Sequence, residues 1–342
     1  MTRHSSHRTR MALLIAVAAL LIVSIFLVLR LVVAGKAPAW RQDGLPGATV
    51  HSLSVDPLRS GVVFAAAETG VYRRDPRGAW QRVLRANIVW SVQALPDGRT
   101  VIAGDQAGTV YVSRDLGHHW TGRSVTPMGV YAVSGQPGHP HRLLAGAGGG
   151  VYLSVDGGVH WRRRLALPNA AGAAFAWRPG TVSTVFAGSV AGAVGGSTRV
   201  FISRDSGLHW RVFGRALGSQ GGIMSLAVPT GHLDAGTMGN RLWTIPLTGG
   251  RWQQHVAGVP PNQHISGIAA VPGPPETFIA TLGTGVFRSN DGGRRWATAS
   301  DGLPSVDHSQ IVLSLAYVPG EHALYAGTTD GVFRMHIAMP TS

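Results

Sequence analysis

The sequence predicts an all-β fold made of repeated units of about 43 residues. The 342-residue chain contains 47 glycines and 20 prolines, and only 13% of its residues are charged. After residue 35, no long stretch shows the apolar spacing of a helix. Tryptophans recur at positions 80, 120, 161, 210, 252 and 296, separated by 40, 41, 49, 42 and 44 residues. These features are typical of a chain with many short strands and tight turns.

The N-terminal segment departs from this pattern. Residues 11–29, MALLIAVAALLIVSIFLVL, are apolar, and as a helix they would span about 28 Å, close to the hydrocarbon thickness of about 30 Å. We predict a basic tail over 1–10, a transmembrane anchor over 11–34 and a propeller-type domain over 35–342. The alternative is a cleavable signal peptide, for which residues 33–35 (VAG) or 37–39 (APA) offer small side chains. Such a peptide has a shorter apolar core of about 7–15 residues.

Charge around the apolar stretch predicts its orientation. Arg3, Arg8 and Arg10 precede it, with no acidic residue among them. The positive-inside rule therefore keeps the N-terminus cytoplasmic and places the remainder of the chain on the extracytoplasmic side of a membrane that the chain crosses once.

Each repeat begins with a short run in which the side-chain type alternates with a period of two residues, and this run ends with a proline. Proline cannot donate a ladder hydrogen bond, so it is expected where a strand stops pairing. The small residue five positions before the proline is expected near the axis of a radial array, where the first strands converge. Seven such runs are present: 50–57, 88–96, 129–137, 172–179, 223–229, 265–272 and 311–319.

Two further short runs follow each first run. The second ends in Ala-Gly or a variant, as in TVIAG (100–104), and the third resembles GVY or GVF, as in GVF at 331–333. A fourth strand contains the tryptophan. Four short strands per 40–45 residues are typical of a β-propeller blade, so the sequence predicts a seven-bladed β-propeller.

The ends of the chain indicate how the ring closes. After GVFRMH (331–336) the chain stops without another tryptophan, so the seventh blade lacks its outer strand. Trp40, in AWRQDGLPG (39–47), lies one period before Trp80. We therefore predict that the strand containing Trp40 completes the seventh blade and joins the two ends, which removes exposed sheet edges.

Four octets share the pattern S-x-D-x-G-x-x-W. Serine and aspartate can bond to backbone groups within a tight turn, and glycine adopts left-handed conformations that other residues avoid. The pattern resembles the Asp-box, or BNR repeat, of sialidases, sortilin-type receptors, some glucan hydrolases and the photosystem II assembly and stability factor. The resemblance implies a structural role, on the face opposite the usual binding face. The octet residues are Ser113, Asp115, Gly117, Trp120, Ser154, Asp156, Gly158, Trp161, Ser203, Asp205, Gly207, Trp210, Ser289, Asp291, Gly293 and Trp296.

Two other repeats retain only part of the octet. Blade one keeps Asp75 and Trp80 at the matching offsets, and blade five keeps Gly249 and Trp252.

The sequence predicts no metal site and no cofactor. The chain has no cysteine, so thiolate ligands are absent. The histidines just before the octet tryptophans belong to three different blades, which are too far apart for their side chains to share one ion. These histidines are His118, His119, His160 and His209.

Three carboxylates are the candidates for catalysis. Glu68, Asp105 and Asp330 are expected in the turns between second and third strands of blades one, two and seven, which become neighbours when the ring closes. These turns face the same way as the glycine-rich insertion at 189–198. An acid and a base could be paired there, as glycoside hydrolysis requires. The alternative is that acidic residues beside glycine simply form hairpin turns.

Charge and repeats together favour a binding protein. The formal net charge is +14, and Lys36 is the only lysine among 30 basic residues. Residues 37–342 carry 25 arginines against 16 acidic residues, a net of +9. An acidic partner surface or anionic lipid would fit this charge, although a bias toward arginine codons would give the same count.

The predicted function is that of a membrane-anchored extracytoplasmic module that binds another protein or assists assembly without catalysis. Its binding surface is expected on the loops 215–222, 257–264 and 301–310 together with the insertion. The alternative is a sialidase-like or glucan-active glycoside hydrolase acting on surface glycans. Nucleic acid is not expected as a partner, because the predicted topology places the domain outside the cytoplasm.

Overall fold

The computed structural model describes residues 39–76, 78–167, 170–191, 198–217, 221–229, 231–239, 241–255, 257–272, 276–305 and 309–337. The predicted basic tail and anchor, residues 1–34, lie outside this part. Within the described ranges, no helix has both the length and the apolar character that a membrane crossing would require.

Antiparallel strands form nearly all the regular structure, as predicted, with one 3-10 turn at Pro319–Glu321 (η1). The first strands are β2 (Val50–Val55), β6 (Val89–Ala94), β10 (Val130–Gln136), β14 (Ala170–Trp177), β18 (Ile223–Ala227), β22 (Ile265–Val271) and β26 (Gln310–Val318). The second strands are β3 (Val63–Ala67), β7 (Val101–Asp105), β11 (His139–Ala147), β15 (Val185–Ala191), β19 (His232–Thr237), β23 (Glu276–Gly283) and β27 (Ala323–Thr328).

The outer half of each unit follows in the same order. The third strands are β4 (Gly70–Arg74), β8 (Thr109–Ser113), β12 (Gly150–Ser154), β16 (Val200–Ser203), β20 (Arg241–Pro246), β24 (Gly285–Ser289) and β28 (Gly331–His336). The outermost strands are β5 (Trp80–Arg85), β9 (Thr121–Ser124), β13 (Arg162–Ala166), β17 (Arg211–Phe213), β21 (Gln253–Gln254), β25 (Ala297–Thr298) and β1 (Arg41–Gly44).

These strands pair into five four-stranded sheets and one eight-stranded sheet among the described residues. The larger sheet differs from the separate sheets that the sequence predicts. It arises because β23 and β26 are long strands whose ends meet, pairing Leu282 with Ile311 and Gly283 with Gln310. This arrangement is consistent with a β-propeller.

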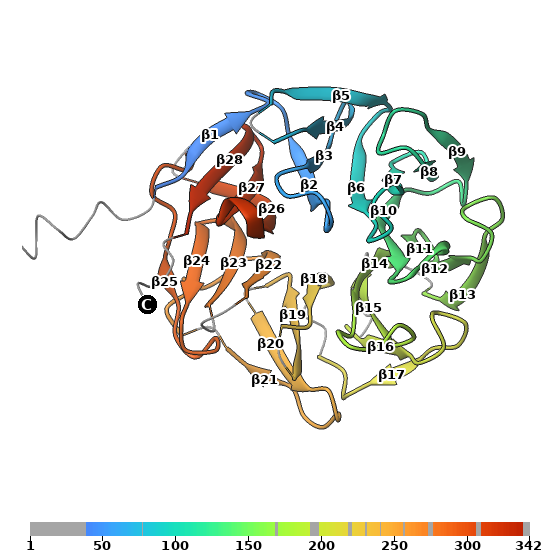
Figure 1. The fold of residues 1–342 in the computed structure, drawn as a ribbon. Helices are drawn as coiled ribbons and strands as arrows, with labels where there is room; N and C mark the ends of the chain where they lie inside the picture. Colours follow the sequence, from blue (N-terminus) through green and yellow to red (C-terminus); the bar gives the residue numbers. More distant parts are fainter. Residues whose placement is uncertain are drawn as a thin grey trace, which may run out of the picture. The chain divides into compact units, whose positions relative to one another are not determined.

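The sheets stand side by side around a common centre, with the first strands innermost (Figure 1). A central cavity of about 340 Å³ is lined by residues from β2, β6, β10, β14, β18, β22 and β26. Ser52, Ser91, Ala132, Gly267 and Ser314 are among them, in agreement with the small residues expected near the axis.

Neighbouring sheets are held together by one recurring apolar contact. In six of the seven second strands, the residue at the same point of the strand pairing packs into the cluster that contains the next tryptophan along the ring. The pairs are Phe64 with Trp120, Ile102 with Trp161, Leu144 with Trp210, Phe186 with Trp252, Phe278 with Trp40 and Tyr325 with Trp80. Burying each such side chain contributes about 1.5–3 kcal/mol.

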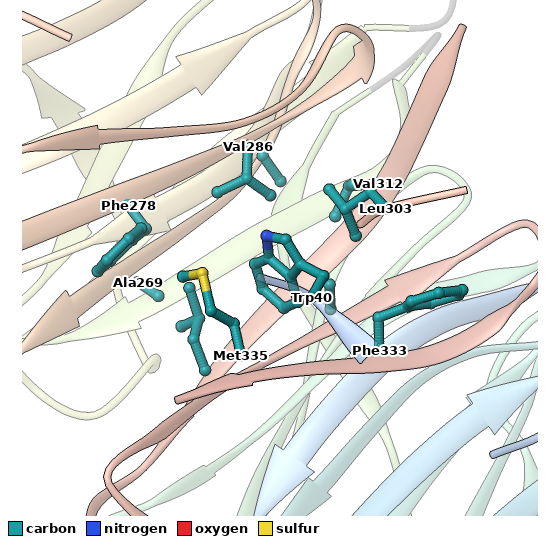
Figure 2. Close-up of a cluster of buried hydrophobic side chains, with 11 residues drawn as sticks. Trp40, Ala269, Phe278, Val286, Leu303, Val312, Phe333 and Met335 are labelled. Atoms are coloured by element: carbon teal, nitrogen blue, oxygen red, sulfur yellow. The ribbon is translucent and has the colours of Figure 1, made fainter. Parts of the chain in front are cut away.

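Strand β1 connects the two ends of the domain. It pairs antiparallel with β28, as the position of Trp40 predicts. Trp40 is 3% exposed, and its ring nitrogen Nε1 donates a hydrogen bond to the Ala299 carbonyl at 2.6 Å. Figure 2 shows its indole among Met335, Val286 and Leu303, which come from three different segments of the chain.

A buried polar cluster lies where β1 and β28 meet β4. The Arg74 guanidinium, 4% exposed in its side chain, contacts Asp43 Oδ2 at 3.3 Å and Glu321 Oε1 at 3.3 Å. It also donates to Tyr325 Oη at 2.8 Å, and Tyr325 donates to Glu321 Oε2 at 2.5 Å. Burial raises the pKa of Asp43 despite the nearby guanidiniums of Arg74 and Arg334. Burial and the hydrogen bond to Glu321 raise the pKa of Tyr325.

We expect Trp40→Ala to lower the free energy of unfolding by about 3–5 kcal/mol, because it leaves a cavity and removes a buried hydrogen bond at the closure of the domain. Urea-induced unfolding followed by circular dichroism measures the change. Leu58→Ala, at a side chain that is 63% exposed, serves as a control with a change within about 0.5 kcal/mol. A loss for the Trp40 variant no larger than that of the control would contradict this role.

Candidate functional site

A β-bulge recurs near the start of the first strands. The register slips by one residue at the same point in six of them, and in β14 the slip lies two residues earlier. A bulge bends its strand and redirects a side chain, and such positions are common beside functional sites. The six bulged residues are His51, Trp90, Tyr131, Met224, Ser266 and Leu313. We call the side of the domain where the first strands begin the entry face.

Three of these residues form an aromatic row on the entry face. The ring centroids of His51 and Trp90 are 4.4 Å apart, and those of Trp90 and Tyr131 are 5.9 Å apart, with interplanar angles of 52° and 33°. Tyr131 is 37% exposed. Trp90 Nε1 and His51 Nε2 are buried and have no hydrogen-bond partner among the described residues. The row therefore combines an apolar surface with a donor and a ring nitrogen that remain unsatisfied.

The electrostatic environment favours a neutral imidazole in this row. Burial lowers the pKa of His51, and the carboxylate of Glu68 acts in the opposite direction. A neutral imidazole has one donor and one acceptor nitrogen, so it can bond to a polar ligand in either sense.

Sequence reasoning missed the aromatic row. The signal was a large residue directly before the small residue in three successive first runs, in the segments VHS, VWS and VYA. It was not recognised because strict two-residue alternation does not show that a bulge turns these side chains onto one face.

The three predicted catalytic carboxylates lie on the entry face, but two of them accept hydrogen bonds from other groups of the domain. Asp105 is 3% exposed and accepts hydrogen bonds from Thr109 N–H at 2.8 Å and from Tyr111 Oη at 3.1 Å. Asp330 accepts from Gly47 N–H at 2.9 Å, which ties the β27–β28 turn to the segment after β1. Glu68 is exposed. No contact among the three carboxylates is present in the described structure.

The predicted binding loops are only partly described. Residues 192–197 of the insertion, 218–220 and 306–308 lie outside the described residues. In the loop at 257–264, His264 Nδ1 accepts a hydrogen bond from Gly239 N–H at 3.2 Å, so this loop is tied to the β19–β20 turn.

The octet turns follow one hydrogen-bond pattern, seen in residues 203–210. Ser203 Oγ donates to Asp205 Oδ1 at 2.7 Å and accepts from Gly207 N–H at 2.8 Å. Asp205 Oδ1 accepts from His209 N–H at 2.9 Å, and Trp210 Nε1 donates to the Gly207 carbonyl at 3.1 Å. The octets at 113–120 and 154–161 have the same bonds.

The octet at 289–296 keeps this turn but differs at its tryptophan. Ser289 Oγ donates to Asp291 Oδ1 at 2.8 Å, and Asp291 accepts from Arg294 and Arg295 N–H groups. Trp296 Nε1, in contrast, has no hydrogen-bond partner in the described structure.

Octet residues at the turn have the left-handed backbone that the pattern predicts. Gly158 has φ +95°, and a β-carbon there would lie 2.8 Å from Val112 Cγ2 of the preceding sheet. Arginines also reach between sheets. Arg114 Nη2 donates to the Gly157 carbonyl at 3.1 Å, and Arg73 Nη1 donates to the Leu116 carbonyl at 3.1 Å.

Strand register corrects the alignment of the turn before Trp80. Arg74 pairs with Val63, as octet serine Ser113 pairs with Val101. The turn is therefore one residue shorter than an octet, and Asp75 does not take the octet aspartate position. Its carboxylate instead pairs with Arg73 at 2.6 Å.

Arginine is the only charged residue type in the outer strands β5, β9 and β13, which occupy the outer edge of the domain (Figure 1). Arg123, Arg162, Arg163 and Arg164 are exposed, and no ion pair joins them to a carboxylate in the described residues. No acidic residue occurs within β5, β9 or β13.

The predicted histidines stay in separate turns. His119, His160 and His209 each place Nδ1 2.6 Å from the aspartate of their own octet. Within the described ranges, no three histidine, aspartate or glutamate side chains are grouped so that they could hold a metal ion.

Comparison with known proteins supports the fold. No protein-family model and no curated protein matches the chain. Among solved structures, the GH74 xyloglucanase from Xanthomonas campestris has a TM-score of 0.66 at 19% identity, over 86% of this chain and 53% of that chain. The Niastella koreensis GH74 enzyme has a TM-score of 0.68 at 16% identity, with the same coverage. YCF48 bound to D1 peptide has a TM-score of 0.66 at 14% identity, over 90% of this chain and 98% of that chain.

At these identities the comparisons show the fold, which is a β-propeller. This chain spans about half the length of the two GH74 proteins and nearly all of YCF48.

The octet aspartates give the stability of the domain a pH dependence. Partial burial raises the pKa of Asp205, but hydrogen bonds from His209 and Ser203 outweigh it and lower that pKa to about 2. The His119 N–H lowers the pKa of Asp115, and the His160 N–H lowers that of Asp156. An unfolded aspartate has a pKa of about 3.9. These ionised carboxylates therefore stabilise the fold above about pH 4, and this contribution is lost as the pH falls through about 2.

We expect the melting temperature of the wild type to fall between pH 4 and pH 2. Asp205→Asn should melt at a lower temperature than the wild type at pH 6, and the difference should shrink toward pH 2 because the variant lacks the titrating carboxylate. Differential scanning calorimetry at several pH values measures both. A difference that stays constant with pH would contradict the assignment.

Proposed function

We propose that the chain is a membrane-anchored, seven-bladed Asp-box β-propeller that binds a protein partner outside the cytoplasm without catalysing a reaction. The count of seven treats β22–β25 as one blade and β26–β28 with β1 as another, although two residue pairs join them. The octet turns carry the Asp-box assignment. The apolar residues 11–29 and the arginines before them support the anchor and its orientation.

The exposed arginines of β9 and β13 are the observation that carries this proposal. Arg123 on β9 and the three arginines of β13 are exposed and form no ion pair with a carboxylate in the described residues, so their charge is available to a partner. Guanidinium groups bind carboxylates in a bidentate manner, which suits an acidic protein surface. Exposed charge on an edge strand also discourages pairing with the edge strand of a second copy of the chain. The arginines are therefore compatible with an outer edge that does not pair with another sheet and still binds an acidic partner.

The candidate carboxylates do not support catalysis equally well. Asp105 accepts a hydrogen bond from the Thr109 N–H of its own hairpin, Asp330 accepts one from the Gly47 N–H after β1, and only Glu68 is exposed. A glycosidase needs two carboxyl groups about 5–9.5 Å apart with the reacting bond between them. Because two of the three carboxylates already accept hydrogen bonds within the domain, their arrangement favours binding over hydrolysis.

A charge-removal experiment tests the binding function. The tagged full chain, expressed in its native host, is cross-linked in intact cells and recovered from detergent. We expect Arg162→Ala/Arg163→Ala/Arg164→Ala to lower recovery of the cross-linked partner at least tenfold. In a parallel recovery without cross-linking, the yield of the wild-type complex should fall as the salt concentration of the buffer rises, because salt screens the attraction between exposed charges.

The matched control is Arg294→Ala/Arg295→Ala, which removes exposed arginines from an octet turn. This variant should recover the partner as the wild type does. Full recovery by the triple variant, or an equal loss in both variants, would contradict a role for β13.

A glycan-active function is the second candidate, favoured by the aromatic row. Rings in the positions of Trp90 and Tyr131 offer the flat apolar surface on which a sugar ring can pack, next to the exposed carboxylate of Glu68. The two GH74 neighbours are compatible with this candidate.

A hydrolysis screen with soluble polysaccharides and sialosides separates the two candidates. We expect no release of reducing ends or sialic acid above background by the purified domain. Hydrolysis that is abolished by Glu68→Gln and retained by Asp75→Asn, at an exposed carboxylate of the turn before Trp80, would overturn the binding proposal.

A further inference from the structure

One junction between neighbouring sheets lacks the apolar residue found at the others. Asp234 of β19 pairs with Ala227 of the first strand β18. In the other six sheets, the second-strand residue that pairs with the equivalent first-strand residue is apolar or aromatic. These residues are Phe64, Ile102, Leu144, Phe186, Phe278 and Tyr325. Those six residues pack toward the next tryptophan. At the junction between the β18–β21 sheet and strands β22–β25, the aspartate stands in this place and the tryptophan is Trp296.

The presence of Asp234 in place of a large apolar side chain leaves a cavity at this junction. A volume of about 250 Å³ lies between these strands, lined among others by Asp234, Thr244, Glu276, Thr277 and Trp296. A β-carbon on the octet glycine Gly207 would lie 2.7 Å from Leu144 Cδ2 of the preceding sheet, whereas one on Gly293 would meet only Trp296 Cζ2, at 3.6 Å.

The cavity wall contains two buried carboxylates. Asp234 is 5% exposed and Glu276 is 7% exposed. Asp234 Oδ1 accepts a hydrogen bond from Thr244 Oγ1 at 2.8 Å and lies 3.4 Å from His232 Nε2. Glu276 Oε1 contacts Nε of Arg288, whose side chain is 48% exposed. Burying a carboxylate is costly unless it is matched by positive charge and hydrogen bonds.

A second, independent feature points to a ligand. Trp296 is 5% exposed and lines this cavity, yet its ring N–H has no acceptor in the described structure, whereas Trp120, Trp161 and Trp210 each donate to an octet carbonyl. Buried donors of this kind are normally satisfied. The wall thus offers carboxylate acceptors for a cation and a tryptophan N–H without an acceptor in the described structure, which can donate to a neighbouring oxygen.

We propose that this cavity binds an alkylammonium group that has a hydroxyl or carbonyl oxygen close to it. The ammonium would bond to Asp234 and Glu276, and the oxygen would accept from Trp296. The volume limits the ligand to a few heavy atoms beyond the ammonium. The same chemistry can come from a free amino alcohol or from the N-terminal residue of a partner, whose α-ammonium stands one carbon away from its carbonyl.

Thermal unfolding of the full chain in detergent tests the site. Ethanolamine hydrochloride represents the free amino alcohol, and glycine amide hydrochloride represents the N-terminal residue of a partner. Ethylene glycol is the uncharged control, and sodium chloride controls for ionic strength. We expect one of the two amines to raise the melting temperature in a saturable way that neither control reproduces, because a ligand that binds only the folded state stabilises it. The amine that saturates at the lower concentration identifies the source.

Two variants tie the effect to the cavity. Asp234→Asn should weaken the amine effect at least tenfold in midpoint concentration while leaving the shape of the cavity unchanged. Asp234→Leu, which supplies the side chain found at Leu144, should abolish it and raise the melting temperature without ligand by about 2–5 °C. Asp75→Asn, at an exposed carboxylate in the turn before Trp80, is the matched control and should bind as the wild type does.

Absence of a saturable shift with either amine would overturn the proposal, as would equal shifts in the wild type and in Asp234→Asn. The result is independent of the partner experiment, because the arginines of β13 and this cavity share no residue.

Discussion

The contact between one sheet and the next is the constraint on which the rest of the structure depends. A four-stranded sheet of this size cannot bury both of its faces by itself, so each must pack on neighbours. Here the packing is repeated as a large side chain of one second strand placed against the tryptophan of the following unit. The octet turn holds that tryptophan through its serine, aspartate and glycine, which explains why the turn recurs with the same period as the fold.

Closure of the domain uses the same contact with a strand from the other end of the sequence. Trp40 fills the place next to Phe278 that an octet tryptophan fills elsewhere, and β1 covers the edge of β28. At the following junction, between Tyr325 and Trp80, a polar cluster around Arg74 joins β4 to β1 and β28. Hydrogen bonds among Arg74, Tyr325 and Glu321 satisfy most of the buried polar groups of this cluster. This junction is therefore held by directional polar contacts as well as by apolar packing.

The candidate functional features lie where the repeat departs from its own pattern. The entry face carries aromatic rings at three bulges, while the equivalent residues of other first strands are Met224, Ser266 and Leu313. The outer edge concentrates unpaired arginines on β9 and β13. One junction has a carboxylate in place of a hydrophobic residue. A scaffold that repeats one stable contact can accommodate such local departures, because the neighbouring junctions retain theirs.

The sequence by itself determined the all-β class, the strands, the octet turns and the pairing of the segment after Trp40 with the last strand. These follow from period, alternation and turn residues, which act over a few neighbouring positions. The tertiary structure alone decided three further features. Ladder register revealed that Arg74 rather than Arg73 takes the serine position before Trp80, and that Asp234 stands in an apolar site. Bulges brought His51, Trp90 and Tyr131, about 40 residues apart, into one row. The hydrogen bonds that Asp105 accepts within its own hairpin and that Asp330 accepts from Gly47 were likewise invisible in the sequence. A one-residue change of register moves a side chain to the other face of a sheet, and that register depends on pairing between strands rather than on local sequence.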